Sequence, residues 1–408
     1  MRLLVLTINY WPEKTGIGAV VTRRCEHLAS AGHEVTVCTG MPYYPEWRIH
    51  ANYTGKMFLR EQRNGITILR SWLWVPKKVS SAKRVLFEAS FLASSLLRVV
   101  LASKPDVLLV VSPPLGLGLS AVLLKRCLNL PYIFDVEDLQ PDAAADLNML
   151  PRSLLPLLYQ IEALAYRNAT LILTVTEGMR QKIIAKGIPA GKVAVLPAAA
   201  DPHLFAIDSA RAGRTFRDRY GLKSKFIVAH AGNMGVKQGL EVVLDSAFLL
   251  REKRDIVFLL AGDGAMRSSL RRRAAELCLT NVRFLPLQEQ GGFLQMLGAI
   301  DAALVVQQST VSDIAFPSKV VTLLAAARPV VASVSSNSEV ARIIVQSKAG
   351  LVIEPERAES LAATIQQLSE DPERRSAMAE CGRRYALNHW HEGRILSNLE
   401  SHILRAMP

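Results

Sequence analysis

Short apolar runs alternate with longer segments of helical periodicity along most of the chain. In the first half these runs predict strands at residues 3–8, 34–38, 66–71, 107–112, 131–136, 171–174 and 193–196. In the second half they predict strands at 226–230, 257–261, 282–284, 302–306 and 330–332. Helices are predicted between them, for example at 18–31, 115–128 and 153–165, and from about residues 238, 265, 318, 338 and 359. This alternation favours right-handed βαβ units, so the pattern predicts an α/β protein with parallel sheets.

The alternation lapses between residues 197 and 222, a segment rich in Ala, Asp, Arg and Gly. The chain has 408 residues, more than a single core usually supports, so we place a connection between two domains there. The expected domains are doubly wound and Rossmann-like, span residues 1–200 and 201–385, and face each other across a cleft. Helices are expected at 374–385 and 390–405, and residues 386–408 are expected to cross back to the first domain. Ligands of such sheets bind at the carboxyl ends of the strands, so the binding residues are expected in the loops after the strands.

The spacing of the cysteines and the nature of the first residues indicate the cellular compartment of the protein. Five cysteines are scattered along the chain without a CxxC pair: Cys25, Cys38, Cys127, Cys278 and Cys381. This spacing favours a reducing compartment over a disulfide framework or a zinc site. The apolar run at the start is too short for a secretory signal and is interpreted as the first strand, so a cytoplasmic protein is expected.

The excess of 49 Lys and Arg over 36 Asp and Glu gives a net charge of +13 and suggests an anionic partner. Nucleic acid is not expected, because the basic residues are not interleaved with the aromatic residues that a base-stacking surface needs. Lys77, Lys78, Lys83 and Arg84 precede an apolar segment that ends at Arg98 and is too short to span a bilayer. This segment is either an interfacial amphipathic helix or a core helix with a solvated basic flank. The first interpretation predicts peripheral binding to the inner face of the plasma membrane.

Glycine-rich loops follow several of the predicted strands, where backbone N–H groups at a helix start can bind an anion. The first loop contains Gly16 and Gly18, but it matches neither a dinucleotide-binding nor a Walker motif. In the second half, a lysine lies near two of the predicted helix starts, and a further turn contains Asp263. The residues that predict a diphosphate site there are Gly232, Asn233, Lys237, Gln238, Asp263, Ser318 and Lys319. The alternative is that each loop is only a structural turn or helix cap.

An acidic run at residues 135–142 follows the strand predicted at 131–136. A carboxylate at this end of a strand, Asp138 for example, can act as a base or bind a hydroxyl group. The alternative is a set of solvated acids that cap a helix. The eight histidines have no metal-ligand spacing, so no metal is expected.

Several motifs together resemble those of the retaining GT-B glycosyltransferases of family 4, also called group 1. They are Gly232-Asn233, Gln238-Gly239-Leu240-Glu241, Ala261-Gly262-Asp263-Gly264, Pro317-Ser318-Lys319, Ala325-Ala326 and Pro329-Val330-Val331-Ala332. Asn9-Tyr10, Pro12-Glu13, Thr15-Gly16-Ile17-Gly18 and Pro42-Tyr43-Tyr44-Pro45 resemble the colanic-acid-type transferases that build bacterial exopolysaccharide. The resemblance covers nearly the whole chain.

The resemblance implies a nucleotide-sugar donor bound mainly by the second domain and an acceptor bound mainly by the first. Lys319, with Lys237 or Gln238, would contact the diphosphate, and Asn233 replaces an arginine of many relatives. The wider family has two glutamates seven residues apart. At these positions the chain has Ile314, with Asp313 beside it, and Thr322. Glu339 is a further candidate for binding sugar or ribose hydroxyls.

The sequence therefore predicts transfer of a hexosyl group, with retention, from a nucleotide-diphosphate sugar to a saccharide acceptor on a lipid carrier. The catalytic candidates are Asp138 and Asp313, and no cofactor is expected besides the donor substrate. Three alternatives stay open. A nucleotide-sugar 2-epimerase shares the architecture, and a catalytically weak partner in a polysaccharide assembly complex fits the missing glutamates. A nucleic-acid-binding protein would explain the charge but would leave the glycine loops unexplained.

Overall fold

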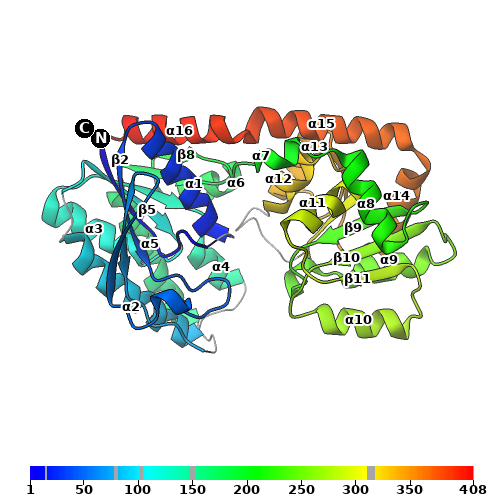
Figure 1. Ribbon diagram of the computed structural model, residues 1–408, viewed down its shortest axis with the longest axis horizontal. Coiled ribbons are helices and arrows are strands. Elements are labelled where there is room, and N and C mark those ends of the chain that lie inside the picture. The colour runs from blue at the N-terminus through cyan, green and yellow to red at the C-terminus, as the bar shows by residue number, and fades with distance from the viewer. Residues whose placement is uncertain (14–15, 78–80, 101–103, 147–151, 310–317, 408) are drawn as a thin grey trace. The chain divides into compact units, whose positions relative to one another are not determined.

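The computed structural model describes residues 1–13, 16–77, 81–100, 104–146, 152–309 and 318–407. The chain folds into two compact units (Figure 1). The first contains Met1–Pro197 and Ile395–Pro408, and the second contains Ala198–Arg394. The second unit is therefore inserted, in sequence, between two segments of the first.

The first unit is built on an eight-stranded sheet in the order β3-β4-β2-β1-β5-β6-β7-β8. Every pair is parallel except β3 and β4. The central strands are continuous apolar runs, because helices cover both faces of the sheet. The strands are β1 (Arg2–Leu6), β2 (Glu34–Gly40), β3 (Phe58–Arg63), β4 (Ile66–Ser71), β5 (Val107–Ser112), β6 (Tyr132–Val136), β7 (Leu171–Thr174) and β8 (Val193–Val195).

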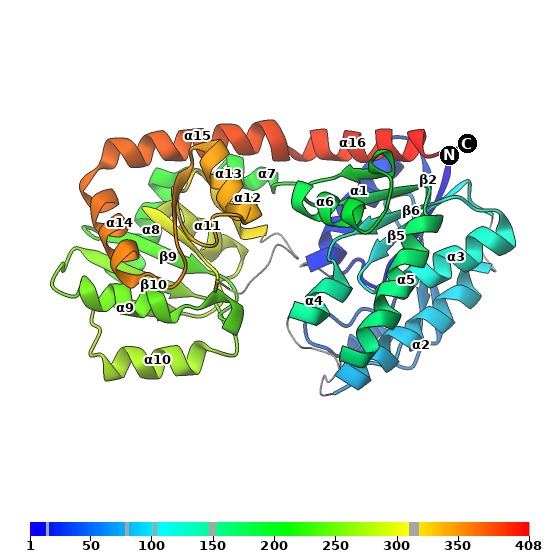
Figure 2. The ribbon, with the colours of Figure 1, turned by 180° about the vertical axis from the view of Figure 1, so that it is seen from behind.

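Right-handed crossovers divide the helices of this unit between the two faces of its sheet. The strand order places α1 on one face, and α2, α3 and α5 lie together on the other (Figure 2). The last helix, α16, buries Ile395, Leu399 and Ile403 at helical spacing, and its Glu400 lies 3.0 Å from the Nε2 atom of His33. The helices are α1 (Gly16–Ser30), α2 (Ser81–Val100), α3 (Leu117–Leu128), α4 (Gln140–Asp146), α5 (Leu155–Asn168), α6 (Glu177–Ala185) and α16 (Glu392–Arg405).

The second unit has a six-stranded parallel sheet in the order β11-β10-β9-β12-β13-β14. Its helices form two layers around it, with α9, α10 and α14 in one and α8, α11, α12, α13 and α15 in the other. The strands are β9 (Phe226–Ala231), β10 (Ile256–Ala261), β11 (Val282–Leu285), β12 (Ala302–Val306), β13 (Val330–Ser333) and β14 (Gly350–Ile353). The helices are α7 (Pro202–Phe205), α8 (Ser209–Tyr220), α9 (Glu241–Leu249), α10 (Arg267–Glu276), α11 (Gln290–Ala299), α12 (Ser318–Ala325), α13 (Glu339–Ser347), α14 (Ala358–Glu370) and α15 (Pro372–Trp390).

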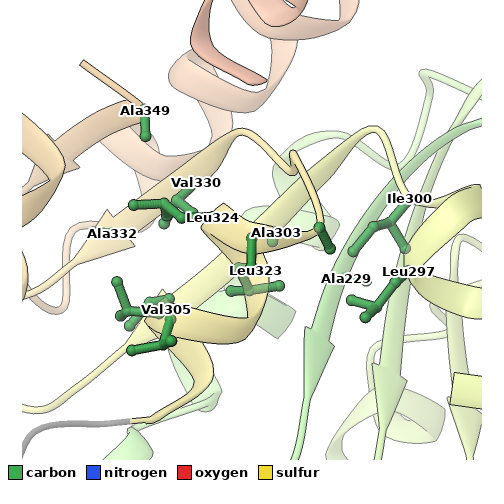
Figure 3. Close-up of a cluster of buried hydrophobic side chains, with 14 of the residues drawn as sticks. Ala229, Leu297, Ile300, Ala303, Val305, Leu323, Leu324, Val330, Ala332 and Ala349 are labelled. Carbon is green, nitrogen blue, oxygen red and sulfur yellow. The ribbon is translucent and has the colours of Figure 1, made fainter. Parts of the chain in front are cut away.

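The core beneath α11 and α12 consists of small and branched side chains. Figure 3 shows Leu297 and Ile300 beside Ala229, and Leu323 and Leu324 among the side chains of β12 and β13. The close fit of α12 against this core fixes the start of that helix, where two of the predicted binding residues lie. Short 3-10 turns complete the fold at Ala51–Tyr53, Arg152–Leu154, Ala190–Lys192 and Val236–Gln238.

The strands predicted at 66–71, 107–112, 171–174 and 302–306 are confirmed at the same residues. The connection expected within residues 197–222 is confined to the start of that segment, where the two units divide between Pro197 and Ala198, and the rest of it forms α7 and α8 of the second unit. Helix α8 is mostly polar, but it buries Phe216 and packs closely on α11 at Gly213. A Cβ atom on Gly213 would lie 2.5 Å from the carbonyl oxygen of Gly298. Strands β3 and β14 were not predicted.

Candidate functional site

Two glycine-rich loops meet at the carboxyl end of the second sheet, where β9 and β10 end. The N–H of Gly232 donates to the carbonyl of Ala261 at 2.9 Å, and the N–H of Met234 donates to the carbonyl of Asp263 at 2.8 Å. A Cβ atom on Gly262, whose φ is +142°, would lie only 1.9 Å from the carbonyl oxygen of Gly232. Glycine at position 262 therefore lets the two loops interlock.

Lys319, in the first turn of α12, lies beside these loops. Its Nζ atom would be 3.9 Å from a Cβ atom built on Gly232. The side chain is half-buried, and burial lowers its pKa to about 8. Among the residues that the structure describes, no hydrogen bond or ion pair satisfies this ammonium group. A partly desolvated charge without a partner is unfavourable, so this position favours the binding of an anion.

His230 lies next to Lys319 and was not singled out from the sequence. It is fully buried near the end of β9, and its Nε2 atom lies 3.2 Å from the carbonyl oxygen of Asn233. Burial, and then the charge of Lys319, lower the pKa of His230 to about 3. The imidazole is therefore neutral at physiological pH, and the positive charge of this part of the site comes from Lys319. A histidine two residues before the glycine of the loop was the available sequence signal.

The other residues predicted on these loops have different environments. The carboxamide oxygen of Gln238 accepts the N–H of Gly235 at 3.0 Å, so this side chain shapes the loop. Asn233 is exposed, and a Cβ atom on Gly264 would meet its Oδ1 atom at 2.6 Å. Asp263 is also exposed and accepts the N–H of Gly264 at 2.8 Å.

The helix predicted from about residue 238 starts three residues later, and a 3-10 turn precedes it. Lys237 is exposed in the 3-10 turn Val236–Gln238, and α9 starts three residues after this turn, at Glu241. The side chain of Gln238 closes the turn on Gly235, and Gly239 follows with a φ of +55°. These two features end the turn before an α-helix can form.

The predicted residues of α12 and α13 lie in the same unit. Ser318 begins α12, and Thr322 is half-buried in the following turn of the helix. Glu339 begins α13 and forms an ion pair with Arg342 on the same helix. Asp313 and Ile314, like the side chain of Ser318, lie outside the described residues. The structure thus brings Gly232, Asn233, Asp263 and Lys319 together around the two loops.

In the first unit, the glycine loop is built around the buried carboxylate of Glu13. This carboxylate accepts N–H groups from Tyr43 at 3.2 Å and Tyr44 at 3.1 Å. Gly18 is required for close packing, because a Cβ atom there would lie 2.9 Å from the Glu13 Oε2 atom. Gly16 has a φ of +64° and follows directly on residues outside the described part of the chain. Burial raises the pKa of Glu13.

The acidic run after β6 is not a set of solvated acids. Asp135 is buried against Arg24 of α1 at 2.5 Å, and Glu137 contacts the same guanidinium group at 2.8 Å. Burial raises the pKa of Asp135, although Arg24 opposes this shift. Asp138 is half-buried in the loop, where its carbonyl accepts the N–H of Gln140 at 3.1 Å. The sequence carried no signal for Arg24, because it lies more than 100 positions before its partners.

No group of three or more His, Cys, Asp or Glu side chains in the described part of the chain could hold a metal ion. None of the helices that the structure describes is both long and apolar enough to cross a bilayer.

The two units match two family descriptions in succession. Residues 15–199 match the glycosyl transferase 4-like domain, and residues 214–385 match the glycosyl transferases group 1. A putative colanic acid biosynthesis glycosyl transferase of Escherichia coli is 32% identical over 376 residues, which are 90% of this chain and 92% of the relative. The chain belongs to the group 1 glycosyltransferases.

Solved structures confirm the fold of this glycosyltransferase. Sucrose-phosphate synthase of Thermosynechococcus elongatus is 16% identical with a TM-score of 0.77, and the match covers 99% of this chain and 98% of that one. The Anabaena protein HepE in complex with UDP is 15% identical with a TM-score of 0.75, over 99% and 100% of the two chains. These likenesses show that the glycosyltransferase has the GT-B fold, with two parallel-sheet α/β domains.

Proposed function

We propose that this glycosyltransferase transfers a hexosyl group, with retention, from a nucleotide-diphosphate sugar to a saccharide on a lipid carrier. The observation that carries the proposal is the ammonium group of Lys319, which has no partner among the described residues and lies beside two interlocked glycine loops. The colanic acid name of the Escherichia coli relative supports a role in exopolysaccharide synthesis. The HepE complex with UDP-glucose supports a uridine nucleotide as a first choice for the donor.

The chemical demand of the reaction is to stabilise the negative charge that develops on the departing diphosphate. Lys319 supplies a fixed positive charge in a site of low polarity, where an ionic interaction is stronger than in water. The interlocked loops leave Asn233 and Asp263 exposed at the same edge, where they would contact the donor. Asp138, on the first unit, is proposed to act on the acceptor hydroxyl. Gly16, Gly18, Lys237, Gln238, Ser318, Thr322, Glu339 and Asp313 complete the proposed donor and catalytic set.

Release of nucleoside diphosphate tests the proposed function. The purified chain is incubated with UDP-, GDP- and dTDP-hexoses, each with and without a lipid extract that contains polyprenyl-linked saccharides. A transferase releases diphosphate faster when the acceptor is present and converts the lipid to a heavier product. Release that is independent of lipid and yields a free 2-epimeric sugar would instead identify the epimerase. Binding of a donor without turnover under every condition would favour the role of an assembly partner.

The lowered pKa of Lys319 predicts that donor binding depends on pH. Because a diphosphate favours the ammonium form, UDP affinity should be constant up to pH 8 and then fall by up to tenfold per pH unit as the free protein loses this proton. Titration calorimetry between pH 7 and pH 9.5 measures the effect. The variant Lys319→Arg should bind UDP with little change over this range, because a guanidinium group does not titrate there. Equal pH profiles of UDP affinity for the wild-type chain and Lys319→Arg would contradict the assignment of Lys319 to the diphosphate site.

We expect Asp138→Asn to lower turnover by about 100-fold or more, while UDP affinity changes by less than about threefold. The amide keeps the shape of the side chain but removes its capacity to accept a proton, and general-base catalysis contributes about 10²–10⁴ to a rate. Asp142→Asn is the matched control, since Asp142 lies in the same acidic run but pairs with Lys186. Wild-type turnover in the Asp138 variant would show that this residue has a structural role and no catalytic one.

We also propose that the enzyme binds the cytoplasmic membrane surface through α2, α3 and α5 of the first unit, without spanning the bilayer. These helices lie side by side (Figure 2) and expose apolar side chains, among them Val85, Leu86, Leu97, Leu123 and Leu157. Lys77 and Lys83 are exposed at the start of α2, whereas Arg84 pairs with Glu88 at 3.1 Å. Lys78 lies outside the described residues. Exposed apolar groups next to basic residues suit an anionic interface.

Vesicle sedimentation tests this membrane proposal. Binding to phosphatidylglycerol vesicles should exceed binding to phosphatidylcholine vesicles and should weaken as salt rises. Changing Lys77, Lys78 and Lys83 to Gln should lower the partition coefficient roughly 100-fold, at about 1 kcal/mol per residue. The control changes three lysines of the second unit, Lys223, Lys253 and Lys348, to Gln. Equal losses for both triple variants, or equal binding to both lipids, would contradict the proposed surface.

A further inference from the structure

The first unit contains a pocket of about 230 Å³, whose lining includes Gly16 and Gly18 of the proposed donor set and none of the proposed donor residues of the second unit. It lies where β1 and β2 end and where α1 and α2 begin, so it opens at the carboxyl end of the sheet. Tyr43, Trp47 and Phe87 form its aromatic wall. Three side chains bring polar groups to its lining, namely Asn9, Arg84 and Glu88. Small-molecule sites in proteins have this composition, a mostly apolar wall with a few polar groups.

The aromatic wall is held in place by contacts between its own rings. Phe87 lies with its ring centre 5.0 Å from that of Tyr43 and 5.4 Å from that of Trp47, and all three pairs are tilted or edge-on. The hydroxyl of Tyr43 also accepts a hydrogen bond from the Asn9 Nδ2 atom at 3.1 Å. Such tilted contacts stabilise the arrangement of the rings. Tyr43 and Phe87 are buried and hold the ring of Trp47, which is partly exposed. The Trp47 ring is therefore a preformed surface that can pack against the apolar C–H face of a sugar with little loss of side-chain entropy.

The polar groups of the pocket balance one another in charge. The Arg84 Nε atom donates to the Glu88 Oε1 atom at 3.1 Å, which leaves further guanidinium donors and a second carboxylate oxygen for other groups. Glu88 is half-buried, and burial raises its pKa. An adjacent donor and acceptor can bind a pair of neighbouring hydroxyl groups. An anionic ligand would instead bring a second negative charge close to Glu88.

We propose that this pocket binds a neutral pyranose, the sugar residue of the acceptor that receives the transferred group. The proposal rests on the proposed function and deepens it, because it specifies the chemical class of the acceptor residue. The aromatic wall orients one face of the ring, and Arg84 and Glu88 bind its hydroxyl groups. A uronic acid is rejected, because its carboxylate would meet that of Glu88.

Saturation-transfer NMR on the full chain tests the proposal without knowledge of the natural acceptor. The probes are the methyl pyranosides of glucose, galactose and mannose, with methyl glucuronide as the charged comparison. At least one neutral glycoside should receive saturation, and its affinity should exceed that of the glucuronide at least fivefold. Glu88→Gln and Trp47→Leu should each weaken this binding at least fivefold. Glu46→Gln is the matched control, because Glu46 is an exposed carboxylate next to Trp47 in sequence and does not line the pocket.

A thermal melt and a UDP titration of each variant establish that it is folded. Binding that persists in both pocket variants, or an equal affinity for glucuronide, overturns the proposal. A lack of binding by every neutral glycoside, in a chain that transfers sugar from a nucleotide donor, also overturns it and leaves the proposed function intact. If the chain binds a glycoside, the pocket variants lose this binding and no transferase activity is found, the pocket proposal stands and the proposed function is wrong.

Discussion

Replacing Lys319 by Ala should weaken UDP binding by about 10- to 100-fold. A hydrogen bond to a charged group contributes about 1.5–3 kcal/mol, and the ammonium group of Lys319 has no competing partner among the described residues. The same change at Lys237, which is exposed, should cost no more than about fivefold, because solvent screens a surface charge. From the sequence alone, these two lysines were equal candidates for the diphosphate contact. The difference in burial now separates them.

Titration calorimetry with UDP measures both affinities, and a thermal melt confirms that each variant is folded. An unchanged affinity in Lys319→Ala would contradict the assignment of the diphosphate site. A larger loss in Lys237→Ala than in Lys319→Ala would move the site from Lys319 to the 3-10 turn after β9.

The second large effect is expected for Gly262→Ala, which should destabilise the second unit by on the order of 3 kcal/mol or more. The added methyl group would overlap the carbonyl oxygen of Gly232, and alanine at a φ of +142° is strained even without that contact. For a unit of this size, the loss corresponds to a melting temperature lower by roughly 6–12 °C. UDP affinity should fall as well, since the two loops can no longer interlock.

Gly291→Ala is the control for this experiment. Gly291 lies in α11, and a Cβ atom there would meet nothing within 4 Å. Because alanine favours a helix over glycine, this variant should melt at the wild-type temperature or slightly above it. Differential scanning calorimetry compares the two variants. A Gly262 variant that melts with its control would show that the loops can separate at no cost.

The buried strands were predictable from sequence because each forms a continuous apolar run. Ile66–Ser71 and Ala302–Val306 begin and end where the pattern indicated. Phe58–Arg63 was missed because it is an antiparallel edge strand with four polar residues and partial exposure along its length. Helix α8 was missed because its burial depends on a close approach of two glycines, Gly213 and Gly298, which no periodicity reveals.

The candidate site was predictable as a set of loops but not as an electrostatic arrangement. Glycines and lysines after strands marked Gly232 and Lys319 correctly as members of one region. Lys319 has no partner within the described part of the chain, and His230 is neutral. Both properties depend on segments almost 90 residues apart in sequence, whose packing no local pattern encodes. The same holds for Arg24, which forms a buried ion-pair cluster with Asp135 at the end of β6 and Glu137 directly after it.

Helix α16, near the C-terminal end of the chain, completes the core of the first unit. Ile395, Leu399 and Ile403 of α16 complete its core, and these residues follow the whole of the second unit in sequence. A ribosome releases about 5–20 residues per second, so the rest of the first unit waits on the order of 10 s or more, while nearly 200 residues are made, for its last helix. During that time the surface that α16 later covers is exposed on a nascent chain. The order of synthesis therefore makes the second unit the first that can finish folding and exposes the first to chaperones.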